Sequence, residues 1–97
     1  MAQTDFYDRL NEYRKKRLLK PLKVDEQLVT EAKLWTIKVD GKVIHDRKTS
    51  RAEVITNGLD PLESWMSSKA HRKIIMGRKY RYIGFYQFNG VACARLK

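Results

Sequence analysis

The sequence predicts an α+β fold in which several helices pack on a small antiparallel sheet. Two observations carry this prediction. Apolar residues recur at helical spacing in the first part of the chain, whereas residues 80–97 alternate around a tight turn. The chain has 97 residues, 42% of them hydrophobic, which is enough for one modest core. We therefore expect a single domain that spans residues 1–97.

Two helices are predicted before the middle of the chain. The first carries Phe6, Leu10 and Tyr13 along one face. It should end before Pro21, because the residue that precedes a proline disfavours the helical conformation. Asp25 is typical of a helix N-cap, and the residues after it again recur at helical spacing. A second helix should therefore begin after Asp25.

Two short helices are predicted next. Ser50 and Glu53 have the spacing of a capping box, which indicates a helix start, and residues 57–58 (Asn-Gly) should end that helix. Asp60 and Pro61 indicate another start, since aspartate caps well and proline suits the first helical position.

The last part of the chain is predicted to hold a helical turn and a hairpin. The turn should run from about Ala70 to Met76. From Tyr80 the residues alternate and are rich in aromatics, and 89–90 (Asn-Gly) is a pair that favours the tight turn between two strands.

Residues 65–84, WMSSKAHRKIIMGRKYRYIG, resemble the signature of the CAP superfamily (cysteine-rich secretory proteins, antigen 5, pathogenesis-related 1), especially its short bacterial members. In that signature a W-x-x-S-x-x-H-R step leads through a short helix into a strand. Residues 9–35 also resemble the opening of a CAP domain. The positions that match there are Asn11, Arg14, Pro21, Leu22, Asp25, Leu28 and Ala32. The resemblance implies a minimal CAP-type α-β-α sandwich.

The resemblance also implies a set of cleft residues. In CAP domains two histidines and one or two acids converge on a cleft between sheet and helices. By position, His45 and His71 resemble the two histidines, and Glu53 resembles the first acid. Ser68 stands where many larger members carry a second glutamate. A mechanism that needs two carboxylates is therefore in doubt.

The run TIKVDGKVIH (36–45) has two interpretations. Its β-branched arms around Asp40 and Gly41 indicate a β-hairpin. The family pattern instead continues the second helix to about Ile37 and then enters a loop towards His45. We follow the helix, and the hairpin remains the alternative.

The chemistry open to these residues is that of two imidazoles and one carboxylate. His45 and His71 could bind a zinc-like divalent ion, with water and a carboxylate to complete the shell. Alternatively, Glu53 could orient a histidine that acts as general base. No catalytic residue stands out, and each of the three also has a purely structural interpretation. We therefore expect a binding module, in preference to an enzyme, for a small ligand, an ion or a partner protein. A metal-assisted hydrolase is the alternative that uses the same cleft.

The net charge of +10 points to an acidic partner. Basic residues concentrate in two runs without an acid, 14–23 and 69–81. The candidates for contact with nucleic acid or another polyanion are Arg14, Lys15, Lys16, Arg17, Lys69, Arg72, Lys73, Arg78 and Lys79. An acidic protein partner and a merely solvated basic surface are the other interpretations.

Cys93 is the one cysteine, so an internal disulfide is impossible, and we expect it to be a small core residue. Neither a signal-peptide apolar region nor a run long enough to span a bilayer is apparent. As given, the chain is expected to be cytoplasmic. The lack of disulfides suggests a bacterial or phage source, with a virion or host-cell location if it is phage-encoded.

Overall fold

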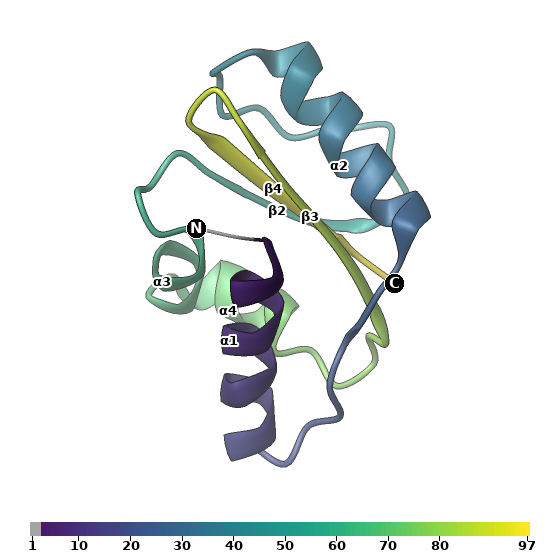
Figure 1. Cartoon of the computed structure of the whole chain (residues 1–97), viewed down its shortest axis with the longest axis vertical. Helices are drawn as coiled ribbons and strands as arrows, with labels where there is room; N and C mark the ends of the chain where they lie inside the picture. The colour runs from purple at the N-terminus through teal and green to yellow at the C-terminus, as the bar shows by residue number, and fades with distance from the viewer. Residues whose placement is uncertain (1–2) are drawn as a thin grey trace.

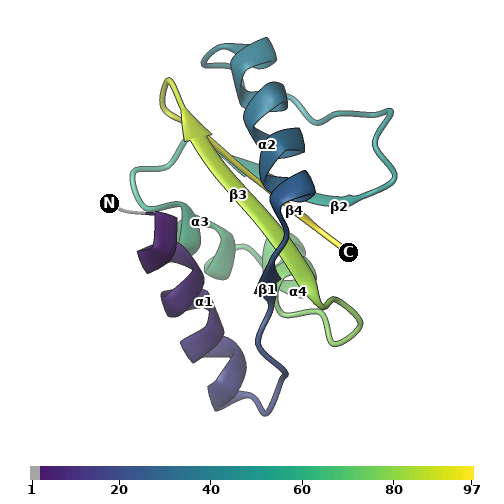
Figure 2. The same cartoon turned by 45° about the vertical axis from the view of Figure 1, so that its right-hand side comes forward.

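The computed structural model describes residues 3–97, which form a four-stranded sheet with helices on both faces (Figure 1). Helix α2 lies on one face, and α1, α3 and α4 lie on the other (Figures 1 and 2). The α-β-α sandwich expected from the sequence is therefore confirmed. In chain order the elements are α1 (Gln3–Lys16), β1 (Lys23–Val24), α2 (Glu26–Val39), β2 (Ala52–Thr56), α3 (Pro61–Met66), α4 (Lys69–Ile75), β3 (Tyr82–Phe88) and β4 (Val91–Leu96).

The sheet is mixed, with strand order β1-β3-β4-β2. The β3–β4 pair is antiparallel, as expected, and β2–β4 is a second antiparallel pair that the sequence analysis did not predict. The two-residue strand β1 pairs with β3 in parallel, so the sheet is not wholly antiparallel as expected. The β3–β4 hairpin turns at Asn89 and Gly90, whose φ angles are 50° and 80°. These positive values are the ones that the Asn-Gly pair tolerates best, so this turn is confirmed.

Helix α2 settles the two interpretations of residues 36–45 in favour of the helix. The Asp25 carboxylate caps it by accepting a hydrogen bond from the Leu28 backbone N–H. The helix runs to Val39 because Thr36 and Val39 continue its buried face. Asp40 then adopts the left-handed conformation and ends it. The hairpin interpretation is wrong because Asp40 and Gly41, which both have positive φ, follow the end of a helix and do not connect two strands.

The helix predicted from the Ser50 capping box is wrong. Residues 52–56 form strand β2, with Val54 and Ile55 buried. Their partners in β4 are Ala94 and Cys93, about forty positions along the chain. Long-range pairing of β-branched residues outweighs the local capping signal at this position.

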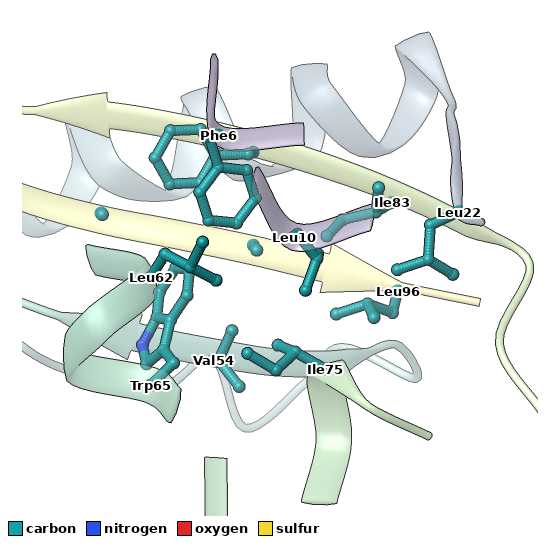
Figure 3. Close-up of a cluster of buried hydrophobic side chains, with 12 residues drawn as sticks. Phe6, Leu10, Leu22, Val54, Leu62, Trp65, Ile75, Ile83 and Leu96 are labelled. Carbon is teal, nitrogen blue, oxygen red and sulfur yellow. The ribbon is translucent and has the colours of Figure 1, made fainter. Parts of the chain in front are cut away.

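The larger core fills the space between the sheet and the three helices α1, α3 and α4 (Figure 3). The Phe6 and Phe85 rings stack with centroids 3.9 Å apart, and Trp65 meets both rings edge-on. The buried members of this cluster are Phe6, Leu10, Leu22, Val54, Leu62, Trp65, Ile75, Ile83, Phe85, Ala92, Ala94 and Leu96.

A smaller core lies under α2 on the opposite face of the sheet. Its buried members are Ala32, Ile55, Val91 and Cys93. Residues of β4 alternate between the two cores, as the pleat of a strand requires. The next residue on the α2 face after Val91 and Cys93 is Arg95. This alternation places the charged side chain of Arg95 on the α2 face of the sheet.

Candidate functional site

The structure brings His45 and Glu53 into direct contact. His45 lies in the loop after α2 and its side chain is 56% exposed, whereas that of Glu53, on β2, is 4% exposed. Their Nδ1 and Oε1 atoms are 3.0 Å apart. A carboxylate accepts hydrogen bonds, so His45 Nδ1 carries the proton and donates it. This contact leaves Nε2, on the other side of the ring, outside the bond to Glu53.

The orientation of Glu53 is fixed by Arg95. Arg95 Nε donates to Glu53 Oε2 at 3.0 Å, and Arg95 Nη2 donates to Asp46 Oδ2 at 2.9 Å. A longer contact of 3.4 Å joins Arg95 Nη1 to Glu31 on α2. Burial opposes the charge of Arg95, but Glu53 and Asp46 outweigh it, so the pKa of Arg95 is raised. The arginine therefore stays charged beneath the site.

Both oxygens of Glu53 are already engaged. Oε1 also accepts the Asp46 backbone N–H at 3.0 Å, and the Cys93 thiol lies 3.9 Å from Oε2. Burial, followed by the charge of Glu53, raises the pKa of Cys93 to about 12. Cys93 is thus a protonated core residue.

His71 and Ser68 form a second contact at the start of α4. Ser68 is the N-cap residue, but its hydroxyl makes no capping bond. It lies instead 2.9 Å from His71 Nδ1. The half-buried His71 has a pKa below its usual value, first because of burial and second because of the charge of His45. No hydrogen bond joins the two imidazoles among the described residues, since their Nδ1 atoms contact Glu53 and Ser68.

A family model described as the cysteine-rich secretory protein family, CAP, matches residues 7–87. The chain belongs to the CAP family. A comparison with curated proteins gives no match.

Solved structures show the same fold as this CAP domain. An outer surface protein from Borrelia burgdorferi superposes with a TM-score of 0.82 at 19% identity, over 96% of this chain and 89% of that one. A cysteine-rich secretory protein from Staphylococcus aureus gives 0.83 at 22% identity, over 96% and 37%. An extracellular SCP-domain protein from Bacillus anthracis gives 0.76 at 17%, over 96% and 39%. The chain thus spans less than half of the latter two proteins.

Sequence reasoning missed the residues that hold Glu53 in place. Arg95 is the central one, joined by Asp46 and Glu31. The signal was present in the run VACARL, where a single charged residue interrupts small and apolar neighbours in a predicted strand. Buried charges are usually paired, so Arg95 indicated a buried acid on an adjacent element.

The residues present fit a metal ion only in part. Among residues 3–97 as described, no group of three or more His, Cys, Asp or Glu side chains is arranged to hold one. Glu53 cannot contribute, because hydrogen-bond donors occupy both its oxygens. His45 and His71 each keep an Nε2 atom, and their Nδ1 atoms bond to Glu53 and Ser68 in the manner of outer-shell partners.

One of the basic residues selected from the sequence does not belong to the surface. Arg14 is fully buried, and its guanidinium donates to the carbonyl oxygens of Lys20, Ile75 and Gly77. It therefore cannot contact a polyanion directly. Arg72 is half-buried and donates to the Met66 carbonyl. The remaining candidates are at least partly exposed: Lys15, Lys16, Arg17, Lys69, Lys73, Arg78 and Lys79.

In the part of the chain described, no helix has the length and apolar character needed to cross a membrane.

Proposed function

We propose that this CAP domain is a binding module whose site is the histidine pair His45 and His71. The observation that carries the proposal is the chain of contacts from Arg95 through Glu53 to His45, which fixes the imidazole by its Nδ1 atom and leaves Nε2 outside that contact. An exposed histidine held by a buried ion pair is costly to maintain for stability alone. A ligand that binds His45 through Nε2 would therefore meet the imidazole ring in one fixed orientation.

The ligand class that fits is a small polar molecule or a zinc-like divalent ion. Two imidazole nitrogens suit zinc but leave most of its coordination positions to water. The net charge of +10 opposes any cation. Zinc should therefore bind weakly, and magnesium, which prefers oxygen ligands, should not bind.

Binding fits the site better than turnover. Glu53 accepts from His45, the Asp46 backbone and Arg95, and the Cys93 thiol lies 3.9 Å from Oε2, so its roughly four lone-pair sites all face protein donors. Ser68 stands where a second carboxylate would be needed. Hydrolysis of an ester or peptide that a chelator abolishes would contradict this part of the proposal.

Calorimetric titration with zinc tests the histidine pair. We expect weak binding by the wild type and loss of the signal in His45→Ala and in His71→Ala. Ser68→Ala should weaken binding, because it releases His71 Nδ1. Ser67→Ala is the matched control, since the Ser67 hydroxyl donates to the Ser64 carbonyl and not to a histidine. Equal isotherms for the wild type and His71→Ala would remove His71 from the site.

A further inference from the structure

The structure joins the two basic segments of the chain at one end of the molecule. Buried Arg14 connects them: its Nε donates to Lys20 O at 2.8 Å, and its Nη1 donates to Ile75 O at 2.9 Å and Gly77 O at 3.1 Å. The Lys23 backbone N–H also donates to Arg81 O at 2.9 Å. The end of α1, the loop to β1 and the loop before β3 therefore lie together (Figure 2).

We call this end the cationic tip. Its basic side chains, all at least partly exposed, are Lys15, Lys16, Arg17, Lys20, Lys23, Arg78, Lys79 and Arg81. Neither of its two segments, 14–23 and 77–81, contains an acidic residue. Charges that are separate in the sequence thus add up on one surface.

Arg14 adds a further positive charge beneath the tip. Its guanidinium donates to carbonyl oxygens, and its buried Nη2 has no hydrogen-bond partner among the described residues. Burial, followed by the charge of Arg81, lowers the pKa of Arg14. A buried cation without a carboxylate partner in the described part of the chain leaves its field uncompensated, so an anion at the surface above it is favoured.

The tip contains a pocket of about 290 Å³. Its charged lining residues are Lys20, Lys23 and Arg81, with Pro21 and Tyr82 beside them. Three cations that line one pocket, with no acidic side chain among its lining residues, suit a phosphate group.

Leu18 protrudes from the turn that follows α1. It is 88% exposed and its φ is 58°, an uncommon conformation for a leucine. Its neighbours in the sequence are Arg17 on one side and Leu19 and Lys20 on the other. Neither water nor a purely ionic partner would bury this apolar side chain, so neither would stabilise it there. Leu18 would be stabilised by a partner that offers an apolar interior beneath a layer of negatively charged groups.

We propose that the cationic tip docks on an anionic lipid bilayer. Leu18 enters the interface, and Lys20, Lys23 and Arg81 hold headgroup phosphates. A bilayer accounts for both the charges and Leu18, whereas nucleic acid accounts only for the charges. The tyrosines of the tip favour the same choice, because Lys79 lies over the Tyr80 ring and Lys97 over the Tyr82 ring. Each of these rings thus has one face occupied, which leaves less of it for stacking on a base.

Flotation with vesicles tests the charge requirement. The full chain should bind vesicles of phosphatidylcholine mixed with phosphatidylglycerol, and should not bind phosphatidylcholine alone. Each basic residue near the surface contributes about fivefold. The triple change Lys20→Glu, Lys23→Glu and Arg81→Glu should therefore lower binding by at least about a hundredfold. The control carries the same change of net charge at positions in the loop after α2: Lys42→Glu, Arg47→Glu and Lys48→Glu. This control variant should lose far less vesicle binding than the triple change at the tip.

The variant Leu18→Asn tests the apolar contact. Asparagine tolerates positive φ, so the turn should keep its shape and the thermal unfolding temperature should not fall. Vesicle binding should fall about tenfold, because most of a leucine side chain leaves the interface. Leu59→Asn is the matched control, since Leu59 is also fully solvent-exposed but lies beside Phe6 and Arg9, towards the start of α1.

Three outcomes would overturn the proposal. The first is that mixed vesicles do not bind. The second is that Leu18→Asn binds as well as the wild type. The third is that the triple change at the tip and its control lose binding equally. Duplex DNA and polyglutamate, used as alternative probes, identify the partner in the first case. A shift of DNA alone would assign the tip to nucleic acid, and binding of polyglutamate alone would assign it to an acidic protein.

Discussion

At the scale of single residues, the orientation of His45 depends on a carboxylate that is itself held by a buried arginine. Glu53 and Arg95 are both nearly inaccessible, and each would be an isolated buried charge without the other. The pair places a fixed acceptor directly beneath an exposed imidazole. Sequence reasoning found His45 and Glu53 as cleft candidates through the family resemblance, but it also placed Glu53 in a capping box, because its partner Arg95 is forty-two positions away.

Replacement of Arg95 should be more destabilising than replacement of Arg51. Arg95→Ala leaves the Glu53 carboxylate buried without its partner, which should cost about 3–5 kcal/mol in the free energy of unfolding. Arg51 pairs with Glu31 near the surface, so Arg51→Ala should change stability little. Urea denaturation followed by circular dichroism measures both. Similar midpoints for the two variants would show that the buried ion pair contributes no more than the surface one.

The pKa of His71 should report the presence of His45. The folded-state pKa lies below the usual 6.5, because of burial and then because of the charge of His45. The stability linked to neutral His71 is therefore complete above about pH 6.5. It is lost as the pH falls through the folded-state pKa, since the unfolded chain takes up the proton more readily. In His45→Ala the His71 pKa should rise towards 6.5.

Titration of the His71 ring protons by NMR measures this shift. Ser67→Ala serves as a control that alters neither histidine contact. An unchanged His71 pKa in His45→Ala would mean that the two rings do not share a site, and would count against the proposed histidine pair.

At the scale of elements, the contact between α2 and β3 depends on Gly84. A Cβ atom at this position would collide with the backbone of α2 at Leu28 and Val29. Backbone atoms cannot rotate away, so Gly84→Ala should force the helix off the sheet and cost about 3 kcal/mol. At Gly58 a Cβ would meet the Ser64 hydroxyl, which can rotate away. Gly58→Ala should therefore be milder, and equal thermal unfolding temperatures would contradict this.

The elements also show how far the sequence determines the fold. Helix α2 and the β3–β4 hairpin were predictable because their signals are local: an aspartate cap for the first and an Asn-Gly turn for the second. Strand β2 was not predictable from its own residues. Ser50 and Glu53 imitate a capping box, and only pairing with β4 shows that the segment is extended.

The same limit applies to the candidate site and to the basic segments. The histidines and Glu53 were found through the resemblance to the CAP family, whereas Arg95 required knowledge of which strands are neighbours. Arg14 was grouped with surface cations because its charge is visible in the sequence. Its burial depends on carbonyl groups of residues 75 and 77, about sixty positions away.

At the scale of the whole molecule, two cores on opposite faces of one sheet should unfold together. The larger core is centred on Trp65, which is fully buried against Phe6 and Phe85. The smaller core packs against Trp35, the one other tryptophan of the chain. Because β3 and β4 serve both cores, loss of one should remove the support of the other.

Trp65→Ala tests this coupling. The cavity should lower the free energy of unfolding by about 3–5 kcal/mol, a large fraction of the total for so small a domain. In this variant the fluorescence of Trp35 reports the α2 side alone, and it should change at the same lowered temperature as the far-ultraviolet circular dichroism. Trp65→Phe is the control: it keeps an aromatic ring and removes an indole N–H that is buried without a hydrogen-bond partner among the described residues, so it should be much closer to the wild type. If the Trp35 signal in Trp65→Ala kept the wild-type transition temperature, the two faces would be independent, and α2 with its histidine loop would form a separately stable layer.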